Sequence, residues 1–171
     1  MSYTHLPKTN EEIIQIDKKK LIFSIKDKPN YIVKIIPDVT YDTKRKAVEN
    51  EIFIQNKAYD ITDPFSPKII DYYVKNNNYY IIMEKIEGYT IADYYGENPE
   101  EVPNYLWTQI RSIIKRLYLN DIHYIDITPY NFIVNKDKVY IIDFGHASIN
   151  KVNWFLKEFL DDENIWNPDF R

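Results

Sequence analysis

The feature of this sequence that most constrains its fold is an apolar run ending in a carboxylate and a glycine. Residues 139–145 are Val-Tyr-Ile-Ile-Asp-Phe-Gly, so a short strand is predicted to lead into Asp143 and a turn that Gly145 permits. Two further polar residues, Asp126 and Asn131, lie in an apolar stretch just after a predicted helix. Ordinary turns would explain each segment alone. On adjacent loops, however, a carboxylate and an amide oxygen form a hard-oxygen site suited to Mg²⁺.

Two charged residues are expected in apolar surroundings in the first third of the chain. Strand alternation places Lys34 on one face with Ile32 and Ile36, where an unpaired Lys is costly. Glu51 falls on the inner side of a predicted helix, next to Ile52. An edge strand would explain Lys34, and a solvated helix face would explain Glu51. A Lys–Glu ion pair that aims the ammonium at a phosphate would explain both.

Periodicity and turn residues predict a sheet-rich first half and a mainly helical second half. The predicted strands of the first half are 12–17, 20–26, 31–36, 69–74 and 79–83, with a helix over 42–59. The second half is predicted to hold a short helix from Thr90 to Gly96, a long helix with Pro103 in its first turn, extended pieces at 132–134 and 139–142, and a helix over 152–160. The long helix carries one apolar stripe, formed by Leu106, Ile110, Ile113, Ile114 and Leu117.

Composition narrows the class of protein. With 171 residues, of which 44% are hydrophobic, the chain can bury a core. A net charge of −4 argues against a general nucleic-acid binder. There is no cysteine, which excludes disulfides and Cys-based metal sites, and no apolar run approaches the roughly 20 residues that span a bilayer. The polar start of the chain does not resemble a signal peptide. We therefore expect a soluble protein of the cytoplasm, without membrane binding.

Taken in order, these residues resemble the motifs of the protein-kinase superfamily. Residues 32–34 are similar to the V-A-I-K strand, residues 126–131 to the catalytic loop, and residues 143–145 are a literal D-F-G. The resemblance covers most of the chain. It implies an α+β, two-lobe fold with an antiparallel-sheet N-lobe at 1–83, a hinge at 84–88 and a truncated helical C-lobe at 89–171.

The resemblance also assigns roles to individual residues. Lys34 would hold the α- and β-phosphates of ATP and pair with Glu51, and Asp126 would accept or orient the proton of the attacking hydroxyl. Asn131 and Asp143 would hold Mg²⁺ or Mn²⁺. In the hinge, Met83 would be the gatekeeper, and the backbone of Glu84 and Ile86 would bond adenine.

Three departures from the family pattern stand out. No glycine precedes Gly88, so the Gly-rich phosphate loop is missing, and the turn at Lys18, Lys19 and Lys20 stands in its place. These lysines would partly replace its backbone amides, or they form an ordinary solvated turn. The catalytic loop lacks Arg before Asp126, which predicts no activation-loop switch. The stretch after Gly145 is too short for the usual closing helices, as in the minimal kinases of large DNA viruses.

The pattern leaves three functions open. The leading hypothesis is an active kinase acting on protein Ser/Thr, for which all four motif residues are present. The second is a pseudokinase that binds and modulates a partner kinase or its regulator, which the missing loop and helices favour. The third is a small-molecule kinase or ATPase of the atypical type, which the Asp-x4-Asn spacing allows. The protein partner is unknown, and the short large lobe is compatible with a homodimer.

The three histidines His5, His123 and His146 are interpreted as ordinary surface or core residues, although His146 could approach the metal or phosphates.

Overall fold

The structure is a computed structural model that describes residues 13–17, 21–62, 65–151, 153–161 and 164–170. The chain divides into two compact units. The first comprises residues 1–48 and 68–85, and the second comprises residues 49–67 and 86–171. The lobe and hinge boundaries 1–83, 84–88 and 89–171 stay a prediction.

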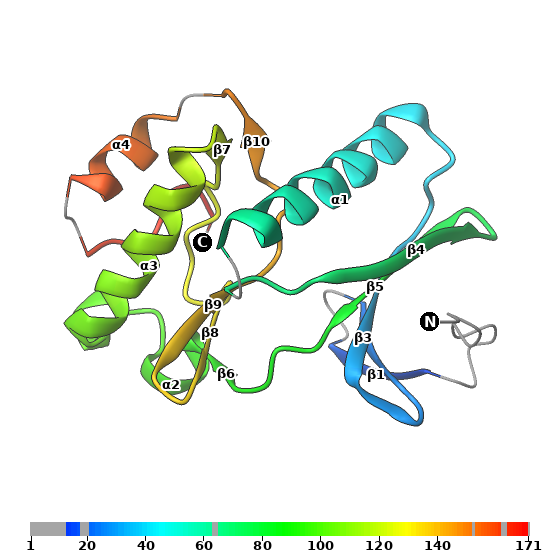
Figure 1. The fold of residues 1–171 in the computed structure, drawn as a ribbon, viewed down its shortest axis with the longest axis horizontal. Coiled ribbons are helices and arrows are strands. Elements are labelled where there is room, and N and C mark those ends of the chain that lie inside the picture. The colour runs from blue at the N-terminus through cyan, green and yellow to red at the C-terminus, as the bar shows by residue number, and fades with distance from the viewer. Residues whose placement is uncertain (1–12, 18–20, 63–64, 152, 162–163, 171) are drawn as a thin grey trace. The chain divides into compact units, whose positions relative to one another are not determined.

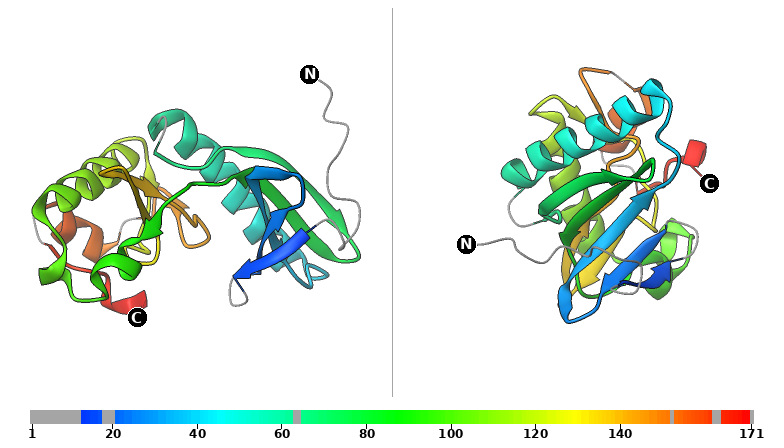
Figure 2. Two further views of the ribbon diagram at one scale, coloured as in Figure 1. Left: turned by 90° about the horizontal axis from the view of Figure 1, so that it is seen from below. Right: turned by 90° about the vertical axis from the view of Figure 1, so that its right-hand side faces the viewer.

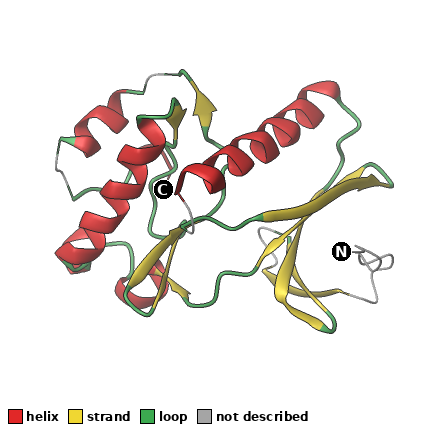
Figure 3. Ribbon diagram, viewed as in Figure 1, coloured by secondary structure: helices red, strands yellow, loops and turns green. Residues whose placement is uncertain are grey.

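The first unit is built on one antiparallel sheet (Figures 1 and 3). Its strands are β1 (Ile13–Asp17), β2 (Ile22–Ile25), β3 (Lys28–Ile36), β4 (Ile69–Lys75) and β5 (Asn78–Glu84). They are arranged in the order β1-β2-β3-β5-β4, and each neighbouring pair is antiparallel. The five predicted strands and their antiparallel sheet are therefore confirmed, with β3 and β5 in the interior of the sheet.

The two faces of this sheet separate Lys34 from a small apolar core. Val33 is fully buried and clusters with Ile25 and Ile82. Lys34 points to the opposite face, where Ile81 stands directly across from it on β5 and is 1% exposed. Because β3 lies between β2 and β5, an edge-strand explanation for Lys34 is wrong.

The second unit is mainly helical (Figure 3). The long helix α1 (Asp42–Thr62) runs into it from residue 49. Its other elements are β6 (Tyr89–Thr90), α2 (Ile91–Tyr95), the 3₁₀ turn Pro99–Glu101, α3 (Asn104–Tyr118), β7 (Ile122–His123), β8 (Phe132–Asn135), β9 (Lys138–Ile141), β10 (Ser148–Ile149), α4 (Trp154–Leu160) and the 3₁₀ turn Pro168–Phe170. Figures 1 and 2 show β8 and β9 side by side as a hairpin, which β6 extends.

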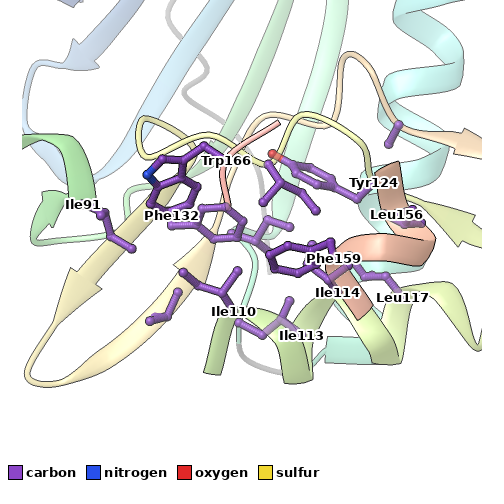
Figure 4. Close-up of a cluster of buried hydrophobic side chains, with 14 of the residues drawn as sticks. Ile91, Ile110, Ile113, Ile114, Leu117, Tyr124, Phe132, Leu156, Phe159 and Trp166 are labelled. Atoms are coloured by element: carbon purple, nitrogen blue, oxygen red, sulfur yellow. The ribbon is translucent and has the colours of Figure 1, made fainter. Parts of the chain in front are cut away.

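The core of the second unit forms around α3. The predicted stripe of α3 is buried along its whole length, and Trp107 joins it. Figure 4 shows this stripe packed against Phe159 of α4 and Phe132 of β8, with Trp166 beside Phe132. Burial of so many large side chains in one cluster supplies the main driving force for folding of this unit.

Several element boundaries follow from local chemistry. Thr90 caps α2 as predicted: its hydroxyl accepts from the Asp93 N–H, and the Asp93 carboxylate accepts from the Thr90 N–H. Pro103 stands one residue before α3 rather than inside its first turn. The helix expected over 42–59 continues to Thr62, and the last helix begins at Trp154, not at 152. Within the described residues, no helix is long and apolar enough to cross a membrane.

Candidate functional site

Asp126 and Asn131 belong to one tightly turned loop between β7 and β8. The Asp126 carbonyl accepts from the Thr128 N–H at 3.0 Å and from the Asn131 side-chain amide at 3.1 Å. The Asn131 N–H donates to the Thr128 carbonyl at 3.1 Å, and Asn131 is 2% exposed. The loop is therefore fixed by its own hydrogen bonds, and Asn131 directs its amide nitrogen back to the residue that carries the candidate catalytic carboxylate.

The end of β9 is joined to this loop by two further hydrogen bonds. The Ile142 N–H donates to the Asn131 carbonyl at 3.0 Å, and the Tyr124 hydroxyl donates to the Ile142 carbonyl at 2.7 Å. The backbone N–H and carbonyl of Ile142, the residue before Asp143, are thus both engaged by the segment that carries Asp126. The structure brings Asp126, Asn131 and Asp143 into one region of the second unit, as the sequence predicts for a hard-oxygen site.

The Tyr124 phenol stays protonated in this setting. Complete burial raises the pKa of its hydroxyl well above the usual range, and the nearby carboxylates of Asp143 and Asp126 raise it further. A protonated hydroxyl is the form that can donate to the Ile142 carbonyl. Tyr124 therefore fixes the distance between the two acidic segments without adding a charge to them.

Asp143 and Glu51 approach the same glycine. Asp143 adopts a left-handed backbone with φ 62°, and its Oδ1 accepts from the Gly145 N–H at 3.4 Å. A methyl group on Gly145 would lie 3.4 Å from Asp143 Oδ1 and 3.5 Å from Glu51 Oε2. Glu51 is only 7% exposed, so a solvated helix face does not explain it. Two of the predicted site residues thus meet at the turn after β9.

The carboxylate of Asp126 has two side-chain neighbours that the motif does not specify. His146 Nδ1 lies 3.0 Å from Asp126 Oδ2, and the Thr128 hydroxyl donates to Oδ1 at 3.4 Å. His146 is 62% exposed and Asp126 is 14% exposed. His146 is therefore a surface residue, as expected, and in addition its ring contacts the Asp126 carboxylate. His123 is buried and bonds the Lys151 carbonyl, as a structural residue would, and His5 lies outside the described residues.

The remaining predicted residues belong mainly to the first unit. Lys34 is half-buried on β3, and Met83 is 6% exposed on β5, opposite Ile32. Glu84 ends β5, where its N–H donates to the Lys68 carbonyl and its carboxylate accepts from the Lys68 N–H. Ile86 is half-buried and is the first residue of the second stretch of the second unit, 86–171. The pairing of Lys34 with Glu51 and the hinge roles stay predictions, and Lys18 to Lys20 lie outside the described residues.

A protein-family model described as "Protein kinase domain" matches residues 19–163. The chain belongs to the protein kinase family. The match includes Lys34, Glu51, the hinge residues and the motif residues Asp126, Asn131 and Asp143. It confirms the two-lobe α+β fold class expected from the motifs. Membership of the protein kinase family supports the interpretation of the chain as a kinase-like phosphotransferase.

Known kinases resemble the chain at low identity. It is 27% identical over 138 residues to the serine/threonine-protein kinase RAD53 of Saccharomyces cerevisiae, an alignment that covers 75% of this chain and 16% of RAD53. It is 34% identical over 71 residues to the EKC/KEOPS complex subunit BUD32 of Encephalitozoon cuniculi, covering 42% of this chain and 34% of BUD32. The chain thus spans only a small part of these relatives.

A viral kinase shares the fold. The structure of PK-1, the kinase of Cydia pomonella granulovirus, matches with a TM-score of 0.58 at 15% identity, over 81% of this chain and 53% of PK-1. At that identity the likeness shows the fold alone.

The donors of this kinase domain fit a divalent metal held together with a nucleotide. Asn131 and Asp143 offer one amide oxygen and one carboxylate, the oxygen ligands that Mg²⁺ prefers. No cluster of three or more His, Cys, Asp or Glu suited to a metal occurs in the part of the chain that the structure describes. Mg²⁺ commonly binds through one or two protein oxygens together with substrate phosphates, and this set suits that arrangement.

Proposed function

We propose that the chain is an ATP-dependent kinase that transfers the γ-phosphate to a hydroxyl group, and that the acceptor is a Ser or Thr of a protein. The observation that carries the proposal is the pair of hydrogen bonds made by the backbone N–H and carbonyl of Ile142. They hold the Asp143 segment against the loop of Asp126 and Asn131. Phosphoryl transfer depends on positioning and charge neutralisation more than on covalent help. A fixed Asp126 carboxylate would serve positioning, and Asp143 would serve neutralisation by holding a divalent cation.

Each predicted residue has a defined part in the proposed reaction. Lys34 binds the α- and β-phosphates and is oriented by Glu51. Met83 borders the adenine, and the backbone of Glu84 and Ile86 bonds it. Asp126 accepts or orients the proton of the attacking hydroxyl. The proposed ligands of Mg²⁺ or Mn²⁺ are Asn131 and Asp143, and such an ion neutralises developing charge on the phosphates.

The exposure of the Asp126 side chain suits this part. At 14% exposure its carboxylate is sheltered by the surrounding loop yet open to an incoming hydroxyl. Its backbone carbonyl is held by Thr128 and Asn131, so the carboxylate projects from a fixed peptide. A general base of this kind contributes about 10²–10⁴-fold to the rate.

The test is transfer of label from γ-labelled ATP with Mg²⁺ or Mn²⁺ and general protein acceptors. The wild-type chain should label protein on Ser or Thr, and Asp126→Asn should lower the rate by about 10²-fold or more while the fold is retained. The isosteric change removes the base and leaves the loop hydrogen bonds of the backbone in place.

Two results would contradict the proposal. Folded wild-type chain that transfers no label would favour a pseudokinase that engages a partner. Label on a small molecule without any protein acceptor would favour a small-molecule kinase.

A site of action in the cytoplasm, of a host cell if the source is viral, also belongs to the proposal, because the cysteine-free composition suits a reducing compartment.

A further inference from the structure

Segment 164–170 crosses the second unit next to the loop of Asp126. It begins at Asn164, whose side chain accepts from Arg111 of α3 at 2.9 Å and donates to Asn104 at 3.1 Å. Trp166 is 2% exposed, with its ring centroid 4.3 Å from that of Trp107 and 6.2 Å from that of Phe132. The segment is therefore held in the core through Trp166, as Figure 4 shows for its place beside Phe132.

Asn167, which follows Trp166, forms hydrogen bonds with the catalytic loop on both sides of Asp126. Its side-chain amide donates to the Ile125 carbonyl at 2.6 Å, and its backbone N–H donates to the Ile127 carbonyl at 2.9 Å. Its Oδ1 accepts from the Asp169 N–H at 3.1 Å. Asn167 is fully buried, so these hydrogen bonds form away from water, where a polar group without a partner is costly.

The amide of Asn167 is used at both of its atoms. The Nδ2 group donates to a carbonyl while the Oδ1 atom accepts from an N–H, and an amide offers these two functions on separate atoms of one planar group. An Asp at this position would keep the size and shape of the side chain but would place a buried, negatively charged oxygen against the Ile125 carbonyl.

We propose that Asn167 is a positioning residue for phosphate transfer: it holds the backbone carbonyls of the residues before and after Asp126, and so sets where the Asp126 carboxylate stands. The inference rests on the proposed function for its catalytic consequence. A shift of about 1 Å in a reacting group can cost about 10²-fold in rate, and Asn167 holds the two residues that flank Asp126.

The same segment reaches the Asp126 carboxylate by a second route. The ring of Phe170 lies 5.0 Å from the ring of His146, and His146 contacts Asp126 Oδ2. Asn167, just before the 3₁₀ turn Pro168–Phe170, thus acts on Asp126 through the carbonyls of Ile125 and Ile127. Phe170, at the end of the turn, acts on it through His146.

The test compares Asn167→Asp with Asn164→Asp in the full chain. Both variants add one negative charge to the same segment with the same change of shape, but Asn164 contacts Arg111 and Asn104 instead of the catalytic loop. We expect Asn167→Asp to lower kcat about 10²-fold with little change in KM for ATP. Amide hydrogen exchange of residues 125–131 should become about tenfold faster or more. Asn164→Asp should leave both near wild-type values.

Asn167→Ala serves as the second variant if the buried charge prevents folding. It removes the amide but keeps the backbone N–H, so it should shift kcat and exchange in the same direction by a smaller factor. Asn167 variants with the kcat and exchange rates of Asn164→Asp would overturn the inference. A wild-type chain that transfers no phosphate would reject the proposed function instead, and exchange in residues 125–131 would still decide whether Asn167 holds the loop.

Discussion

The contact between His146 and Asp126 is the residue-scale feature that most directly concerns the proposed chemistry. The imidazole reaches Oδ2 at 3.0 Å and Thr128 reaches Oδ1 at 3.4 Å, so each carboxylate oxygen has a side chain beside it. A hydrogen bond to a charged group contributes about 1.5–3 kcal/mol, and it also restricts the rotation of the carboxylate. His146 should therefore orient Asp126 toward its acceptor.

His146→Ala should lower kcat about tenfold with KM for ATP unchanged, because it frees the Asp126 carboxylate to rotate. His146→Asn should recover most of the rate, since the Asn amide can donate from nearly the same position as Nδ1. Steady-state transfer kinetics of the two variants and the wild type measure this. Equal rates for His146→Ala and wild type would show that the contact has no part in transfer.

Tyr124 gives a pH-dependent prediction at the same scale. Burial raises the pKa of its hydroxyl in the folded chain, whereas the unfolded chain titrates near the ordinary value of about 10. Above that pH the unfolded state loses the proton first, so the free energy of unfolding falls as pH rises toward the folded pKa. Tyr124→Phe should flatten this fall and, near neutral pH, cost about 1 kcal/mol for the lost bond to Ile142.

Urea unfolding from pH 8 to pH 11 measures both effects. Tyr89→Phe is the matched control, because Tyr89 is 61% exposed and its loss removes a phenol from the surface. If the free energy of unfolding falls with pH as steeply in Tyr124→Phe as in Tyr89→Phe, the raised pKa of Tyr124 is not the cause of the fall.

Among the elements, the short strand β6 depends on the glycine before it. A Cβ on Gly88 would lie 2.2 Å from the Val134 carbonyl oxygen, and Gly88 has φ +127°. Such a close approach is what permits Tyr89 to pair with Val134 of β8. An alanine at this position must either overlap the backbone of β8 or break the pairing.

Gly88→Ala should therefore cost about 4 kcal/mol or more of stability. The control is Gly96→Ala, because Gly96 also has a positive φ, of 69°, but a Cβ there meets nothing within 4 Å. Backbone strain alone costs about 1–3 kcal/mol. Denaturant unfolding compares the two variants, and equal losses would show that the approach to Val134 is relieved by a small movement.

The elements also show what the sequence could and could not predict. Long periodic segments such as α1 and α3 were predictable, because a stripe of buried residues repeats over several turns. The two-residue strands β6, β7 and β10 carry no such period. The protein kinase family was predictable because the order of the motif residues along the chain is diagnostic. The contacts of Asn167 and His146 with the loop were not predicted. Asn167 bonds Ile125, which is 42 residues away, and His146 contacts Asp126, which is 20 residues away. No local sequence pattern encodes such contacts.

For the whole molecule, the proposed function assigns roles to residues of both units: Lys34 of the first, and Asn131 and Asp143 of the second. A ligand that binds only the folded chain stabilises it by about 2.7 kcal/mol at 100 times its Kd. For a chain of this size that corresponds to about 5–10 °C in Tm. ATP with Mg²⁺ should raise Tm by this order, and removal of the metal with a chelator should lower the increase.

Variants in the two units should separate the nucleotide and metal contributions. Lys34→Met should reduce the increase in Tm with and without Mg²⁺, because it removes the cation proposed to bind the phosphates. Asp143→Asn should remove only the metal-dependent part, because it weakens a proposed metal ligand. The exposed Asp60 of α1 provides the control Asp60→Asn, which makes the same change of charge away from the site. If Asp143→Asn and Asp60→Asn respond alike to Mg²⁺, Asp143 is not a metal ligand, whatever Lys34→Met does to nucleotide binding.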